Sequence, residues 1–226
     1  MSADLSIVLL TLRVALAATL VVLPVGVLAA WWLARWRGPG RSLVETMLAL
    51  PLVLPPTAVG LLLLELLRPA GAIGRLLSGL NLEVLFTWKA AAIASAVMAF
   101  PLMVRPVRTA FEEADPRLTS LARSLGDGPI RAFRRIALPL AWRGILAGTV
   151  LAFARAVGEF GATILIAGSI PGRTQTLALA IFHRTQIGQD AEALRLVAIT
   201  VAIAFVALWS TELLRTRRSR RLRGEP

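Results

Sequence analysis

The chain has 226 residues, of which 57% are hydrophobic, and a mean hydropathy of +0.73. Long uncharged runs within this composition are typical of a polytopic membrane protein and leave no room for an added soluble domain. The formal net charge of +12 does not indicate a nucleic-acid partner, because the arginines bracket the apolar runs instead of covering a soluble face, and the absence of cysteine excludes thiolate chemistry.

Five apolar segments are long enough to cross a bilayer as helices. We therefore expect one all-α transmembrane domain that occupies the whole chain, residues 1–226. A further apolar piece, Thr176 to Phe182, is too short to span and is expected to lie at the outer face or to dip into the protein. The expected spans are residues 14–34, 46–67, 84–104, 144–170 and 194–214, and the first is longer if the apolar run from Leu5 continues past Arg13.

The distribution of basic residues orients these spans. The loops after the first and third spans, together with the tail that contains Arg215 to Arg223, hold 17 of the 25 basic residues. Short cytoplasmic loops of membrane proteins carry an excess of Lys and Arg. The N-terminus is therefore expected outside and the C-terminus in the cytoplasm, where the basic tail can contact membrane lipid headgroups.

The second expected span is rich in residues that break helices. Pro51, Pro55, Pro56 and Gly60 remove or weaken backbone hydrogen bonds at several points. Such breaks are tolerated in lipid where the freed carbonyls face protein or a water-filled cavity. The pattern predicts a kinked helix that lines a pathway, with Thr57 as its polar contact. The alternative is a kinked helix that serves packing alone.

The segment between the third and fourth spans, residues 111–140, is too charged to cross a bilayer and carries regular helix signals. Asp115 is expected to cap a helix that begins at Pro116, where the missing N–H costs nothing. An apolar stripe follows at positions i, i+3, i+4 and i+7, and Gly126 then ends the helix. The stripe consists of Leu118, Leu121, Ala122 and Leu125.

A second short helix is expected directly afterwards. Gly128 can cap it, and Pro129 suits its first position. Two amphipathic helices in series can pack their apolar residues on the protein's own base or dock a soluble partner, and the pattern leaves both open. In the second helix the apolar residues are expected to face away from the arginines, with Ile130, Phe133 and Ile136 on one side and Arg131, Arg134 and Arg135 on the other.

The fourth expected span carries two charges. Arg155 and Glu159 are four residues apart, which places them on one face of a helix. Charged side chains at membrane depth normally pair with one another or line water. Two interpretations stay open: a gate or pathway element, in which Gly158 and Gly161 allow close backbone approach, or a self-neutralising pair that fixes packing.

Several catalytic motifs are missing. No phosphate-binding loop of the form Gly, four residues, Gly-Lys-Ser/Thr occurs, and neither His-Glu-x-x-His nor Gly-x-Ser-x-Gly is present. We therefore expect that the chain is not an enzyme and binds no cofactor itself. His183, the single histidine, has no nearby ligand set, so no metal site is expected. An ATP-independent carrier or channel remains the alternative from another class, although such proteins need no docking helix.

In the charged segment, Gly126 is followed after nine residues by Ile136, and after one more residue by Leu138-Pro139. This spacing resembles that of the coupling loop of bacterial ABC importer permeases. The motif's usual Glu-Ala-Ala start is Ser120-Leu121-Ala122 here, so the resemblance extends to the helix–turn–helix geometry and not to a glutamate contact.

This resemblance implies the fold of a type I ABC importer permease. Its loop, residues 112–139, would sit in a cleft of a separate ATPase subunit and transmit the closure of that subunit to the spans. ATP and Mg would be used by the dimer of ATPase subunits and not by this chain. The residues implied in coupling are Leu118, Leu121, Ala122, Leu125, Gly126, Ile136, Leu138 and Pro139.

Two further stretches resemble molybdate permeases of binding-protein-dependent importers: Ala154 to Phe182, and the run "LPLVLPPTAVGLLLL" in the second span. The Gly-Glu-Phe-Gly element in the first stretch is shared with sulfate permeases. The resemblance implies a homodimer in the bacterial inner membrane that takes molybdate from a periplasmic or lipid-anchored binding protein, with outer contacts from Thr174 to Gly188. Sulfate, thiosulfate and tungstate remain alternative substrates.

Overall fold

The computed structural model describes residues 3–223, and it describes the side chains of these residues except for Ala3, Pro116 and residues 210–223. The prediction for the basic tail therefore falls outside the described side chains. Within the described range every regular element is helical, which confirms the all-α prediction. In chain order the elements are α1 (Ala3–Arg35), α2 (Arg41–Val53), α3 (Pro56–Leu67), α4 (Gly74–Gly79), α5 (Trp88–Glu113), α6 (Pro116–Ser124), α7 (Pro129–Ala132), the π-helical turn η1 (Phe133–Ala137), α8 (Leu138–Leu140), α9 (Trp142–Val157), α10 (Gly161–Ile166), α11 (Leu177–Gln186) and α12 (Asp190–Arg223).

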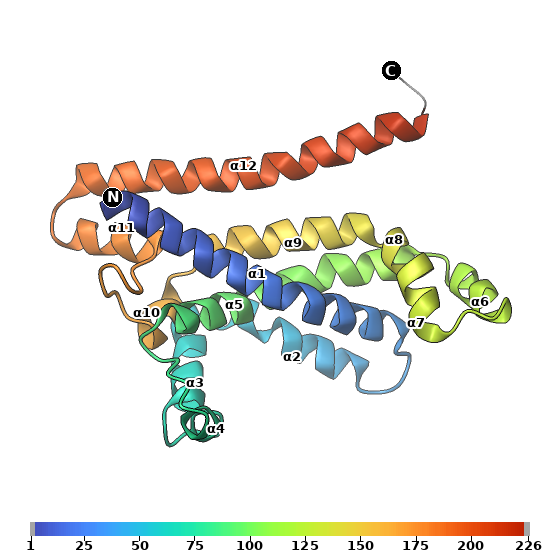
Figure 1. The fold of residues 1–226 in the computed structure, drawn as a ribbon, viewed down its shortest axis with the longest axis horizontal. Helices are drawn as coiled ribbons and strands as arrows, with labels where there is room; N and C mark the ends of the chain where they lie inside the picture. Colours follow the sequence, from blue (N-terminus) through green and yellow to red (C-terminus); the bar gives the residue numbers. More distant parts are fainter. Residues whose placement is uncertain (1–2, 224–226) are drawn as a thin grey trace.

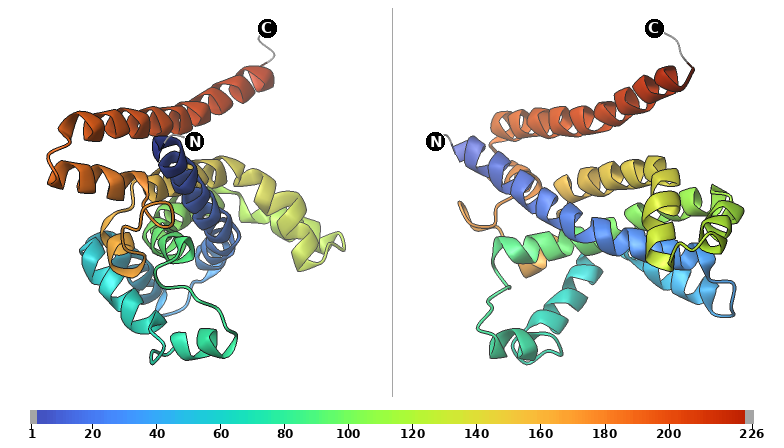
Figure 2. Two further views of the ribbon diagram at one scale, coloured as in Figure 1. Left: turned by 60° about the vertical axis from the view of Figure 1, so that its left-hand side comes forward. Right: turned by 45° about the vertical axis from the view of Figure 1, so that its right-hand side comes forward.

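Helices α1, α5 and α9 pack against one another and form the centre of the molecule (Figures 1 and 2). Small residues bring them together. A Cβ atom at Gly148 of α9 would lie 2.9 Å from the carbonyl oxygen of Met103 on α5, and one at Gly144 would lie 2.6 Å from the carbonyl oxygen of Pro106. Because helices in lipid associate mainly through close packing, such glycines favour the α5–α9 contact.

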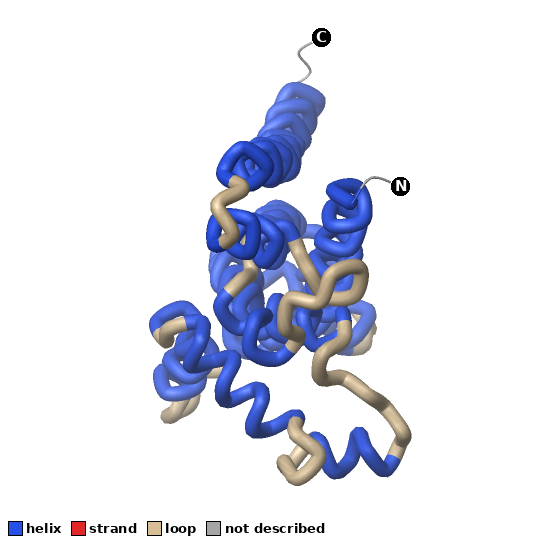
Figure 3. The backbone as a smooth tube through the Cα atoms, turned by 90° about the vertical axis from the view of Figure 1, so that its left-hand side faces the viewer, coloured by secondary structure: helices blue, strands red, loops and turns tan. Residues whose placement is uncertain are grey.

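The remaining helices surround this centre. Helix α12 runs along α9 and α11, where Leu196 is completely buried. Helices α3 and α4 form an arm that projects from the bundle, and the end-on view of Figure 3 shows this arm and α12 on opposite sides. The segment α6–α8 lies at one end of the bundle, and α10 and α11 lie at the other (Figure 1).

In the described part of the chain, three helices are long and apolar enough to cross a membrane: Asp4–Arg35, Trp88–Glu113 and Asp190–Trp209. Two bent helix pairs meet the same criterion and raise the number of spans to as many as five. One pair is α2 with α3, bent by 109°, and the other joins Pro129–Leu140 to α9 with a bend of 73°.

Two of the expected spans begin at different residues in the structure. Helix α1 starts well before residue 14 and includes Arg13, whose guanidinium carbon lies 4.0 Å from the centroid of the Trp88 ring. The face of an aromatic ring attracts a cation, so the Trp88 ring gives the Arg13 guanidinium a favourable electrostatic partner away from bulk water. Helix α5 starts at Trp88 because the Thr87 hydroxyl accepts a hydrogen bond from the Lys89 amide at 3.2 Å and caps the helix.

The other differences are breaks. Residues 46–67 form no single kinked helix, because α2 ends at Val53 and α3 begins at Pro56 after a sharp bend. The range 144–170 holds α9, a break at residues 158–160, the short helix α10 and a loop. The short outer helix expected near residues 176–182 is present as α11.

Candidate functional site

The loop between α5 and α9 has the helix–turn–helix form that the sequence predicts. The Asp115 carboxylate accepts a hydrogen bond from the Arg117 amide at 2.9 Å and caps α6. Gly126 follows the helix with φ +95°, a left-handed conformation that glycine adopts without strain. Helix α7 then begins at Pro129. The Asp115 cap, a proline at the first position of each helix and the left-handed Gly126 therefore set the helix starts and the turn between them.

The large apolar side chains of this loop point outward. Leu121 is 59% exposed, Leu125 81% and Ile130 74%, and Leu118 is also exposed. Ala122, in the middle of the same stripe, is buried. In the described part of the chain, these side chains do not pack on the protein's own base. Leu118, Leu121, Leu125 and Ile130 form what we call the coupling surface.

The rest of the loop anchors this surface to the bundle. The Phe133 ring packs on Trp31 and Phe111, with ring centroids 5.0 and 6.2 Å apart. Ile136 and Leu138 are half-buried. Phe133 therefore faces the protein while Ile130 faces away, which corrects the prediction that both lie on one side. The Phe133 ring is held inward by its packing on Trp31 of α1 and Phe111 of α5.

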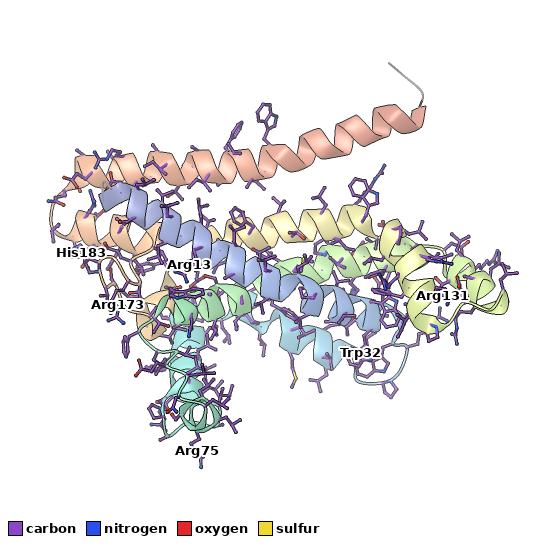
Figure 4. All side chains as sticks on the ribbon, viewed as in Figure 1. Arg13, Trp32, Arg75, Arg131, Arg173 and His183 are labelled. Atoms are coloured by element: carbon purple, nitrogen blue, oxygen red, sulfur yellow. The ribbon has the colours of Figure 1, made fainter. Side chains whose placement is uncertain are left out.

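Basic side chains frame the coupling surface. Asp127 lies 3.5 Å from Arg131 and 3.9 Å from Arg135, measured between the charged atoms. Arg131, Arg134 and Arg135 line an open groove that begins at Gly126. Figure 4 shows Arg131 at this end of the molecule and Arg13, Arg173 and His183 at the opposite end. The molecule thus has two polar ends joined by apolar helices.

Arg155 and Glu159 form an ion pair, with 2.6 Å between Arg155 Nη2 and Glu159 Oε2. The Glu159 side chain is 1% exposed and that of Arg155 25%. Helix α9 ends at Val157, so the two residues do not lie on one continuous helix as predicted. Glu159 stands before α10 instead, and its Oε1 accepts a hydrogen bond from the Ala162 amide at 2.8 Å. The carboxylate therefore fixes the junction between the two helices.

Helix α10 packs very closely on α3. A Cβ atom at Gly60 would lie 2.8 Å from the Cα atom of Ala162, and the Cβ of any residue in place of Gly161 would lie 2.6 Å from the Cβ atom of Pro56. The second contact also brings the backbone of Thr57 close to Gly161, while the Thr57 side chain is exposed. The structure thus brings together α3, α10 and the Arg155–Glu159 pair.

We expect Gly161→Leu to destabilise the protein, because the added side chain would collide with Pro56. Overpacking of this kind costs about 1–3 kcal/mol. Gly158→Ala is the matched control, since the nearest atom to a Cβ there is the Ala154 carbonyl oxygen at 3.9 Å. Thermal unfolding of the purified variants in detergent measures the effect, and equal midpoints for the two variants would contradict the packing argument.

The segment Thr174 to Gly188, which is expected at the outer face, divides into a buried and an exposed part. Thr174, Gln175 and Thr176 are buried, and the Thr174 hydroxyl accepts from the Ile170 amide at 3.0 Å. The exposed part begins at Phe182 on α11 and includes His183. Any outer contact made by this segment therefore belongs to its second half.

One cluster of charges was missed in the sequence. Arg41 and Glu45 on α2 form ion pairs with Arg108 and Glu112 on α5. The spacing of four residues within each pair is visible in the sequence, but the 71 positions between Arg41 and Glu112 hide the contact between the helices.

Comparison with known proteins places the chain among transport components. It is 47% identical over 207 residues to the molybdenum transport system permease protein ModB of Escherichia coli (strain K12), covering 91% of this chain and 90% of the relative. The corresponding protein of Haemophilus influenzae is 41% identical, covering 97% and 96%. The sulfate transport system permease protein CysT of Salmonella typhimurium is 36% identical, covering 88% of this chain and 72% of the relative.

A solved structure shares the fold. A bacterial ABC transporter involved in the import of the acidic polysaccharide alginate matches with a TM-score of 0.70 at 20% identity, covering 98% of this chain and 80% of the other.

The family model described as "Binding-protein-dependent transport system inner membrane component" matches residues 22–224. This match confirms the predictions of a permease fold, of an inner-membrane transport component and of a chain that is not an enzyme. The chain belongs to the family of binding-protein-dependent transport system inner membrane components.

Proposed function

We propose that this chain is the membrane-spanning subunit of an ATP-driven importer that carries molybdate across the cytoplasmic membrane. The observation that carries the proposal is the 47% identity, over nine-tenths of both chains, to a protein named as a molybdenum transport permease. The sulfate permease with 36% identity makes sulfate or thiosulfate the second candidate. Tungstate, another tetrahedral dianion, is the third.

The coupling surface supports an ATPase as the partner. Exposed leucines on a capped helix at the end of a membrane bundle have no role in the isolated chain, and they lie outside the apolar segments that lipid would cover. An apolar groove in a soluble subunit fits such a helix. ATP and Mg would be bound by that subunit, so that this chain supplies the movement and not the hydrolysis.

The remaining partners follow from the arrangement of the two ends. A second copy of the chain would complete the pathway, and α3 and α10 would lie near that pathway. The coupling end, which also holds the basic groove, would face the cytoplasm, and the N-terminus would lie outside. A periplasmic or lipid-anchored oxyanion-binding protein would then meet the opposite end, where Arg13, Arg173 and His183 lie.

The test is uptake of labelled molybdate at trace concentration in cells with and without this chain. We expect uptake to depend on the chain and to resist excess sulfate, while competition by tungstate measures how strictly the importer selects. Uptake that excess sulfate abolishes would move the assignment to sulfate. Uptake that does not depend on the chain would contradict the proposal, and uptake that continues without the ATPase would favour a carrier.

A further inference from the structure

Helix α2 is held to the rest of the protein by little apolar contact. Among the described residues, none on α2 is buried, and Leu43 and Met47 are exposed. Val44 and Leu48 are the partly buried α2 residues that pack against the central core. Apolar burial therefore contributes little to the position of this helix.

The first turns of α2 are instead tied to α5 by a closed ring of four charges. Glu45 Oε1 lies 2.6 Å from Arg41 Nε and 2.6 Å from Arg108 Nη1. Glu112 Oε1 lies 3.4 Å from Arg108 Nε and also contacts Arg41 Nη2. Each carboxylate thus bridges both guanidinium groups. We call Arg41, Glu45, Arg108 and Glu112 the ion-pair ring.

The ring has no net charge and is partly exposed to water. Its side chains are 27–33% exposed. Exposed single ion pairs contribute little, but a network of partly buried charges with several bonds per group holds its members in a defined geometry. Two of its bonds cross from α2 to α5, one through Arg41–Glu112 and one through Arg108–Glu45. These cross-helix bonds set where α2 lies.

The ring sits between two parts that would move. Glu112 is in the last turn of α5, three residues before Asp115, the cap of α6. At its other end α2 meets the break at Leu54–Pro56, where the chain turns by 109° into α3. A cavity of about 480 Å³, lined by Ser42, Thr46 and Thr109 among others, leaves space between α2 and α5 beside the ring. Helix α2 is thus hinged at one end and fastened at the other.

We propose that Arg41, Glu45, Arg108 and Glu112 are positioning residues that transmit movement of the coupling loop to α2, through the two bonds that cross from α5. The inference rests on the proposed function, since it needs an ATPase that moves the loop. Movement of the end of α5 carries Glu112 and Arg108 with it, and the ring obliges α2 to follow about its proline hinge. The ring therefore connects ATPase closure to the broken span.

A charge exchange tests the cross-helix bonds separately from the bonds within each helix. Glu45→Arg opposes Arg108 with a like charge, and Arg108→Glu opposes Glu45. The double variant E45R/R108E restores the 45–108 attraction and keeps Arg41–Glu112, while both bonds within a helix become repulsive. We expect each single variant to lower uptake at least about tenfold, and the double variant to recover most of it. The control is Glu65→Arg, which breaks the exposed Arg68–Glu65 pair on α3.

Two measurements on the purified complex, reconstituted with its ATPase and binding protein, separate coupling from simple stability. In the single variants we expect normal assembly and continued ATP hydrolysis, with uptake lost. Uptake that falls only in proportion to the amount of complex, singles that transport normally, or a double variant that is no better than the singles would each overturn the inference. Failure of the proposed function would appear in the wild-type protein itself, as uptake that does not depend on the chain.

Discussion

Leu121→Asp is expected to abolish ATPase-coupled uptake while leaving the chain folded in the membrane. The side chain is 59% exposed on the coupling surface, so the substitution should disturb no packing within the chain. A charge in an apolar docking groove, by contrast, is desolvated without a partner and costs several kcal/mol. We expect the ATPase to be lost on co-purification through an affinity tag on this chain, and stimulated hydrolysis to fall at least about a hundredfold.

The control for this experiment is Ser78→Asp, which adds the same charge at an exposed position of α4, away from the coupling surface. It should leave co-purification and stimulated hydrolysis near wild type. Unchanged hydrolysis in Leu121→Asp would show that the coupling surface does not dock the ATPase. Gly126→Pro is a second disruptive variant, because proline cannot adopt φ +95° and would misplace α7 relative to α6.

Removing the guanidinium of Arg155 should damage the protein more than neutralising Glu159. Arg155→Gln leaves the Glu159 carboxylate almost fully buried without its charged partner, and breaking a buried pair in this way costs about 3–5 kcal/mol. Glu159→Gln keeps an oxygen that can accept from the Ala162 amide, and it leaves Arg155, which is 25% exposed, with access to water.

We therefore expect a large loss of folded Arg155→Gln protein on extraction in detergent. Glu159→Gln should assemble normally and import less, because the neutral side chain keeps the bond from the Ala162 amide but loses the ion pair with Arg155 that ties α9 to the junction. Size-exclusion profiles of the extracted complexes, together with uptake per amount of complex, measure both effects. Loss of the complex in Glu159→Gln would instead assign the pair to packing alone.

The parts of the fold that follow from neighbouring residues could be predicted from the sequence. Asp115, Pro116 and Gly126 set the ends of α6 through capping and a left-handed turn, and these signals need no distant contact. The outer helix α11 and the apolar character of α1, α5 and α12 were predictable for the same reason.

The parts that depend on distant contacts could not be predicted. Gly158 and Glu159 follow the end of α9 at Val157, but apolar residues resume directly after them, so the sequence alone does not distinguish a break from a continuous span. The bond from Glu159 to the Ala162 amide is local, but the close packing of Gly161 on Pro56, about a hundred positions earlier in the sequence, cannot be inferred from neighbouring residues. The ion-pair ring was missed for the same reason. The inward direction of Phe133 depends on its packing on Trp31 and Phe111, which the periodicity of the loop does not reveal.

The break between α2 and α3 also has a consequence for water. Pro55 and Pro56 have no amide hydrogen, so the carbonyl oxygens of Pro51 and Leu52 lack the donor that a continuous helix would give them. In hydrocarbon an unbonded carbonyl is too costly to persist, so either hydration or a donor from another protein group must reach it. The two carbonyl oxygens therefore form a polar site within an otherwise apolar span. Such a site can hold water molecules within the span before any anion arrives.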